Sequence, residues 1–207
     1  FDFGQTPVGL LYIAMELLRG RTLSSILRQV GGPMDPIRSV RIIDQVLDSL
    51  GEAHSVGVIH RDLKPDNIFV LEGAVAQDFV KVLDFGIAKI QRSPGDDVTQ
   101  SGQMFGTPSY MSPEQTQGRE LDSRSDLYSV GVMLFEMVSG CLPFQADTPF
   151  VLMLKKVQEK APDVREINPD AVVPDPLAEV VNRLLSTQPG DRYGSAAETK
   201  AVLADVL

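Results

Sequence analysis

Residues 60 to 67 read His60-Arg61-Asp62-Leu63-Lys64-Pro65-Asp66-Asn67, and no other stretch of the chain is as informative. The string gathers carboxylates, a lysine and an amide, and its proline disfavours a continuous helix. Short apolar runs follow at Ile68–Val70 and Val80–Leu83, with the β-branched and aromatic residues that favour strands. The pattern therefore predicts a polar loop carried by small strands, where functional residues concentrate.

Two further motifs follow in order, Asp84-Phe85-Gly86 and Gly106-Thr107-Pro108-Ser109-Tyr110-Met111-Ser112-Pro113-Glu114. Each is weak alone, but the three in this order resemble the catalytic loop, the metal-binding motif and the end of the activation segment of protein kinases. The sequence from Tyr110 to Gln115 is similar to that of the eukaryotic-like Ser/Thr kinases of bacteria. The resemblance to these kinases runs from Tyr12 to the C-terminus. It implies transfer of the ATP γ-phosphate to protein Ser and Thr hydroxyls with Mg²⁺.

The resemblance implies a role for each polar residue of these motifs. Asp62 would accept the proton of the substrate hydroxyl, and Lys64 would hold the transferred phosphate. Asn67 and Asp84 would bind Mg²⁺, a hard cation that prefers oxygen ligands. Thr107 would help to seat the Ser/Thr substrate.

Other residues receive nucleotide-binding or structural roles from the same resemblance. The adenine contacts would be Met15, the Glu16 carbonyl, the Leu18 amide and Phe69. His60 would pack with Phe85, Asp126 would bind the catalytic-loop backbone, and Glu114 would pair with Arg192. His54 is also interpreted as a structural residue. Arg61 would bind a phosphorylated activation loop, for which Thr99 and Ser101 are the predicted phosphorylation sites.

Periodicity and capping residues predict an α+β chain that is mostly helical. We expect strands at 10–15, 68–70 and 80–83, and a loop over 91–119. Helices are expected at 23–30 with Thr22 as N-cap, from Asp35 to near Gly57, and at 125–139, 149–158, 175–185 and 196–207. The fold class implied by the resemblance is a kinase C-terminal lobe with the hinge strand of the N-terminal lobe. Residues 1–20 would be the remnant of the small lobe and hinge, and residues 21–207 the large lobe.

The sequence departs from the kinase pattern in one respect. No two of its glycines lie two positions apart, so it has no G-x-G phosphate loop, and Lys64 is its first lysine. The first residue is Phe1, which favours a truncated and inactive piece of an intact kinase. A kinase relative that lacks the small lobe and acts as a binding module is the alternative. A small-molecule phosphotransferase is disfavoured by the docking segment with Thr107 and Glu114.

Composition limits the partners and the compartment. Nineteen Lys and Arg against 28 Asp and Glu give a net charge of −9, which argues against nucleic acid or anionic lipid as a partner. The apolar stretch 127–144 is interrupted by Glu136, two glycines and a proline, so it is a buried helix rather than a membrane span. The single cysteine of the chain, Cys141, excludes an internal disulfide. We expect protein substrates, self-association through the exposed lobe interface, and the cytoplasm as the site of action, either free or as part of a membrane-anchored protein.

Overall fold

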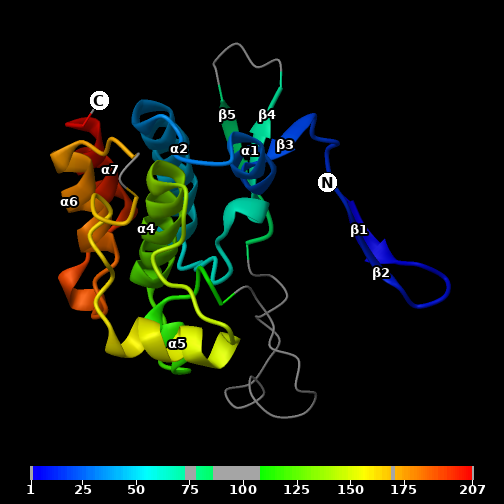
Figure 1. Cartoon of the computed structure of the whole chain (residues 1–207). Helices are drawn as coiled ribbons and strands as arrows, with labels where there is room; N and C mark the ends of the chain where they lie inside the picture. The colour runs from blue at the N-terminus through cyan, green and yellow to red at the C-terminus, as the bar shows by residue number, and fades with distance from the viewer. Residues whose placement is uncertain (1, 73–77, 86–107, 169–170, 207) are drawn as a thin grey trace.

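The computed structural model describes residues 2–72, 78–85, 108–168 and 171–206. Two long helices, α2 and α4, run side by side through the centre of the body, and α6 and α7 cover one side of them (Figure 1). The helix bounds are α1 Leu23–Val30, α2 Pro36–Ser55, α3 Pro113–Thr116, α4 Ser123–Ser139, α5 Pro149–Gln158, α6 Asp175–Leu184 and α7 Ala196–Ala204. Short 3-10 turns lie at η1 Pro65–Asn67 and η3 Pro189–Asp191.

Local capping explains where the first helices begin. The Thr22 hydroxyl accepts from the Ser25 amide at 3.2 Å, and Asp35 Oδ1 accepts from the Arg38 amide at 2.8 Å. These bonds satisfy amides that have no partner inside the helix. The expected starts at 23 and just after Asp35 are therefore confirmed, and so are the predicted helices in the C-terminal half to within three residues at each end.

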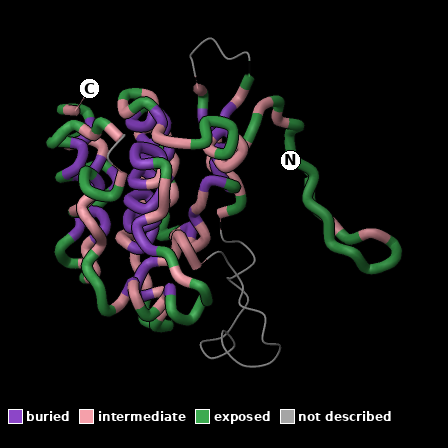
Figure 2. Tube along the Cα trace, in the orientation of Figure 1, coloured by how far each residue is buried: buried purple, intermediate pink, exposed green. Residues whose placement is uncertain are grey.

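Helix α4 is the centre of the hydrophobic core. Nearly every residue from Ser125 to Ser139 is buried, and Figure 2 shows it as an almost continuous purple segment. Gly131 lets α6 approach closely, because a Cβ at this position would lie 2.7 Å from the Cβ of Leu184. No helix in the described part of the chain is long and apolar enough to cross a membrane.

The catalytic loop leads directly into β4, the central strand of a three-stranded antiparallel sheet in the order β3-β4-β5. Its strands are β3 Gly20–Thr22, β4 Ile68–Leu71 and β5 Phe79–Val82. The two later strands match the prediction, but β3 lies where only a connector was expected. Gly20 has φ +155°, and a Cβ there would lie 2.1 Å from the Val70 carbonyl oxygen, so only glycine allows this pairing.

The N-terminal segment forms a hairpin that projects away from the helical body (Figure 1). Strands β1 Asp2–Gln5 and β2 Leu11–Ala14 pair in antiparallel register, whereas the sequence predicted only the second. Every residue of β2 is exposed, as the green hairpin in Figure 2 shows.

The segment 91–119 was predicted to be a loop throughout, and this was wrong for its last part. Pro113–Thr116 form the single-turn helix α3, capped by Ser112. One turn is too short to show a period in the sequence, although the pattern Ser112-x-x-Gln115 resembles the sequence signature of a helix start.

Candidate active site

The catalytic loop is held in shape by its own side chains. Asn67, at the end of the η1 turn, donates from Nδ2 to the Asp62 carbonyl oxygen at 2.9 Å. Lys64 Nζ donates to Asp62 Oδ2 at 3.0 Å. The carboxylate, the ammonium and the amide predicted to share a site are therefore brought together.

A buried carboxylate in α4 anchors the start of this loop. Asp126 accepts from the His60 amide at 2.9 Å and from the Arg61 amide at 3.0 Å. His54 Nε2 donates to Asp126 at 2.8 Å, which is the partner that the sequence could not name for this histidine. The contact that the resemblance implied for Asp126 is present, and its three donors fix the backbone that leads into Asp62.

The metal-binding motif is tied to the catalytic loop through Leu83, the residue before it, and through Phe85, its second residue. The Leu83 amide donates to the Asn67 carbonyl oxygen at 2.8 Å, and His60 Nε2 donates to the Leu83 carbonyl oxygen at 2.9 Å. The His60 and Phe85 rings lie 4.9 Å apart. Asp84 is exposed and has φ +54°, a conformation that aspartate tolerates better than most residues.

The donor set fits a hard divalent cation. Because Asn67 uses Nδ2 for the Asp62 carbonyl, its Oδ1 remains an acceptor, and the exposed Asp84 carboxylate supplies the second oxygen. No group of three or more His, Cys, Asp or Glu side chains among the described residues could hold a metal. Two protein oxygens nonetheless suit Mg²⁺, which takes most of its ligands from phosphates and water.

Helix α3 joins the docking segment to the catalytic loop and to the late helices. Glu114 pairs with Arg192 through two short contacts, at 2.7 and 2.8 Å, and both side chains are buried. Burial favours the neutral acid, but the Arg192 guanidinium and the Ser125 hydroxyl outweigh it and hold the pKa of Glu114 below its usual value. The ion pair implied by the resemblance is thus present.

Gln115 is a site residue that the sequence interpretation missed. Its Oε1 accepts from the Ser112 amide at 2.8 Å, while its Nε2 donates to the Arg61 carbonyl oxygen at 2.6 Å. The capping pattern could have revealed the first contact, but nothing in the sequence indicates the second.

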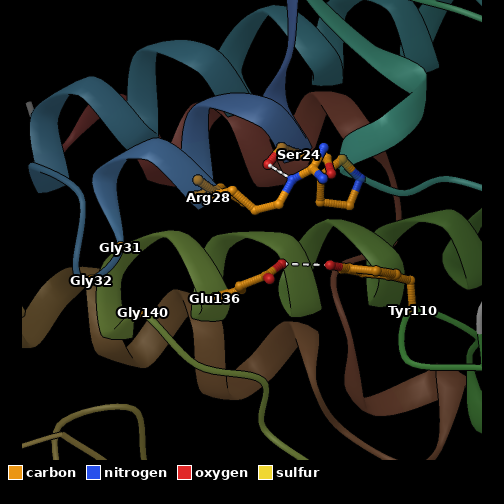
Figure 3. Close-up of a pocket in the computed structure, with 9 residues that line it drawn as sticks. Ser24, Arg28, Gly31, Gly32, Tyr110, Glu136 and Gly140 are labelled. Atoms are coloured by element: carbon orange, nitrogen blue, oxygen red, sulfur yellow. Dashed lines mark hydrogen bonds between the residues drawn. The ribbon is translucent and has the colours of Figure 1, made fainter.

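A cavity of about 300 Å³ lies beside the loop, between α1 and α4 (Figure 3). Tyr110 and Pro65 line it, and the Tyr110 hydroxyl donates to Glu136 Oε2 at 2.6 Å across its floor. Burial raises the pKa of Glu136, the Tyr110 bond opposes this, and the negative charge of Asp66 adds to the increase. Because Pro65, the residue that follows Lys64, lines the cavity, the cavity borders the catalytic loop.

The residues predicted to contact adenine are only partly assembled. Phe69 packs against the chain at Gly20, where a Cβ would come within 3.0 Å of its ring, and it pairs in the sheet with Thr22 and Lys81. Met15 is 63% exposed, and Glu16 is also exposed and pairs with Lys81. Leu18 is half-buried. Of the four predicted contacts, Leu18 and Phe69 are therefore half-buried, whereas Met15 and Glu16 are exposed.

Three predicted residues, Thr99, Ser101 and Thr107, lie outside the described residues, as does Gly86. Arg61, predicted to bind a phosphorylated loop, is described and half-buried. Among the described residues its guanidinium has no hydrogen-bond or ion-pair partner.

Comparison with known proteins identifies the family. Residues 6–203 match the protein kinase domain. The chain is 47% identical over 207 residues to the serine/threonine-protein kinase pkn3 of Myxococcus xanthus, covering 99% of the chain and 38% of that protein. It is 40% identical over 211 residues to the serine/threonine-protein kinase PknB of Mycobacterium tuberculosis, covering all of the chain and 32% of that protein.

A solved structure agrees on the fold. The PknI kinase domain of Mycobacterium tuberculosis superposes with a TM-score of 0.71 at 23% identity, over 99% of this chain and 68% of that one. The α+β kinase fold predicted from the motifs is thereby confirmed, while this chain spans about a third of the length of its relatives pkn3 and PknB. The chain belongs to the protein kinase family, and its relatives are Ser/Thr protein kinases of bacteria.

Proposed function

We propose that this chain forms the large lobe of a Ser/Thr protein kinase and supplies its catalytic loop, its metal ligands and its substrate-docking segment. The observation that carries the proposal is the contact set around Asp62, in which Lys64 Nζ and Asn67 Nδ2 bind its carboxylate and its carbonyl oxygen. A scaffold has no need for this arrangement of an acceptor, a cation and a metal ligand.

The proposed reaction moves one phosphoryl group and one proton. The substrate hydroxyl oxygen forms a bond to the γ-phosphorus of ATP, and the bond from that phosphorus to the β,γ-bridging oxygen breaks, so ADP leaves. Asp62 accepts the hydroxyl proton through the oxygen that Lys64 leaves free, and Lys64 neutralises charge on the transferring group. Asn67 holds Asp62 in place through the loop backbone.

A divalent cation belongs to the same proposal. Asn67 Oδ1 and the Asp84 carboxylate would hold Mg²⁺, which would neutralise charge on the ATP phosphates. The backbone bond from Leu83 to Asn67 keeps the two ligands in a fixed relation.

The chain by itself lacks two parts that phosphoryl transfer needs. It has no G-x-G loop and no lysine ahead of Lys64 to hold the α- and β-phosphates. We therefore expect the 207-residue chain alone to bind Mg-ATP weakly and to transfer phosphate negligibly, and an active purified chain would refute this. The same missing parts are the reason for the alternative, a kinase relative that lacks the small lobe and acts as a binding module.

Substitution of Asp62 and of Asp84 distinguishes a catalytic kinase from a binding module without catalysis. In a polypeptide that joins this chain to a complete small lobe, Asp62→Asn removes the proton acceptor and lowers turnover by about 10²- to 10⁴-fold. Asp84→Asn, which weakens a metal ligand, also lowers turnover, and raising the Mg²⁺ concentration restores part of it. The exposed Asp191→Asn is the matched control and keeps parental activity. A parent without activity supports the binding module, and an active Asp62→Asn variant refutes the catalytic role.

The exposed hairpin is the surface through which we expect copies of this chain to associate. Its exposed large apolar side chains are those of Phe3, Val8, Leu10, Leu11, Tyr12 and Ile13, and the exposed Met15 and Leu17 follow it. Exposed apolar groups gathered on one element favour association, so the chain alone should form oligomers at high concentration. A clean monomer in sedimentation at high concentration would contradict this expectation.

A further inference from the structure

Helix α5 carries a lysine that the proposed chemistry does not use. Lys156 is 1% exposed and is among the largest fully buried side chains of the described residues. Lysine is almost never buried unless its charge has partners. A specific set of contacts must therefore hold this ammonium group.

The partners of Lys156 lie in Ser109–Met111, the part of the docking segment directly before Ser112, and below the name docking segment is kept for these three residues. Its Nζ donates to the Ser109 carbonyl oxygen at 2.5 Å and to the Met111 carbonyl oxygen at 2.8 Å. The Tyr128 ring of α4 lies 5.3 Å from the same nitrogen, at cation–π distance. Two carbonyl oxygens and an aromatic ring thus face the buried nitrogen, which can donate to both carbonyls as an ammonium or as a neutral amine.

Tyr110, which lies between Ser109 and Met111, is bound by helix α4. The Tyr110 carbonyl oxygen accepts from the Ser129 hydroxyl at 2.8 Å, and the Tyr110 hydroxyl donates to Glu136. Three successive carbonyls are thus divided between α5, which binds the first and the third, and α4, which binds the second. Without Lys156 the docking segment keeps its attachment to α4 and loses its attachment to α5.

The catalytic loop has separate supports. Asp126 and Gln115 bind its backbone, and the hydrogen bonds of Lys156 go instead to Ser109 and Met111. Tyr110 of the docking segment, in contrast, lines the same cavity as Pro65. A change at Lys156 should therefore alter how a peptide is seated and leave the proton acceptor in place.

We propose that Lys156 is a positioning residue that fixes the docking segment against α5 and so determines how tightly the protein substrate is seated. The proposal rests on the proposed kinase function and adds a specific role for α5 in it. Its kinetic signature is a change in KM for the protein substrate, with kcat and the KM for ATP nearly unchanged.

The first measurement does not depend on kinase activity. Lys156→Met keeps the length of the side chain and removes its donors, so hydrogen exchange at the Ser112 amide, which is bonded to Gln115 directly after the docking segment, should become about tenfold faster in the 207-residue chain. Exchange in α2 should stay as in the parent. Lys155→Met is the matched control, because Lys155 Nζ binds the Gln145 carbonyl oxygen and not the docking segment. Unchanged exchange in Lys156→Met, or faster exchange throughout the chain, would overturn the proposal.

The second measurement is kinetic and uses the polypeptide with a complete small lobe and a Thr-containing peptide that the parent phosphorylates. Lys156→Met should raise the peptide KM about tenfold with kcat within about twofold, and Lys155→Met should match the parent. Lys156→Arg retains the charge and several donors and should restore most of the affinity. A fall in kcat at constant KM would overturn the proposal. A parent that phosphorylates nothing would instead refute the kinase function, and hydrogen exchange would then decide the role of Lys156 alone.

If Lys156→Met does not fold, Lys156→Gln replaces it in both measurements. Its amide keeps N–H donors but is shorter and uncharged, so the increases in exchange and in KM should be smaller than for Lys156→Met but in the same direction. Parental values in a folded Lys156→Gln variant would overturn the proposal equally.

Discussion

Gln115 donates a hydrogen bond from Nε2 to the backbone carbonyl oxygen of Arg61, at 2.6 Å and across 54 residues of sequence. Arg61 has φ +64°, and its amide is bound by Asp126 at 3.0 Å. The backbone amide and the backbone carbonyl of Arg61 are therefore both hydrogen-bonded. These bonds hold a left-handed backbone conformation that costs energy for a residue with a side chain. Asp62 follows directly, so the α3 helix and the catalytic loop are mechanically joined.

Gln115→Glu tests this joint. Glutamate retains the acceptor for the Ser112 amide but cannot donate to the Arg61 carbonyl, so turnover should fall about three- to tenfold, as expected for one lost hydrogen bond. The control is Gln117→Glu at an exposed position of the same turn. Steady-state kinetics of the polypeptide with a complete small lobe give the result, and equal kcat values for the two variants would contradict the coupling.

Arg192→Met should be strongly destabilising. It leaves the Glu114 carboxylate buried without its partner, which typically costs about 3 to 5 kcal/mol of unfolding free energy. The control Lys200→Met removes a partly exposed cation that pairs with Asp44 and Asp48 and should cost at most about 1 kcal/mol. Urea unfolding compares the two, and similar losses would mean that the buried pair has no special importance.

The buried Lys156 should make the free energy of unfolding depend on pH above about 7. Burial lowers its pKa from 10.5 to about 7, so between these values the unfolded chain binds more protons than the folded chain. The free energy of unfolding should consequently rise as the pH increases from 7 to 9. Lys156→Met should show a flatter profile over this range. Urea titrations at each pH provide the difference between the two proteins, and parallel profiles would rule out a lowered pKa.

Phosphorylation of Thr99, and secondarily of Ser101, should activate the intact kinase. The Arg61 guanidinium lacks a partner among the described residues, and a phosphate brings a charge of about −1.5 to −2 for it to bind. Phosphopeptide mapping with Thr99→Ala and Ser101→Ala variants identifies the sites. Arg61→Met should abolish the activation, whereas Arg119→Met, an exposed control, should not. Full activity of an unphosphorylated double variant would exclude this route.

Much of the helical structure was predictable because its determinants are local. Thr22 and Asp35 cap helices that begin at the next residue, and the apolar run from Leu127 predicts a helix buried on all sides. The three motifs likewise identified the family and the residues around Asp62. In each case the signal lies within a few residues of the feature that it predicts.

Other features depend on segments that meet only after folding. Gly20–Thr22 become a strand because β4 is there to pair with them, and their three residues carry no periodicity of their own. The partner of His54 is Asp126, 72 residues away, and Lys156 lies 45 residues or more from the carbonyls it binds. Residue types and caps therefore determined the helices and the identity of the catalytic loop, since they act over one turn of chain. The supports of that loop were decided by packing, because a buried polar group takes whichever partner the folded chain brings within hydrogen-bond distance.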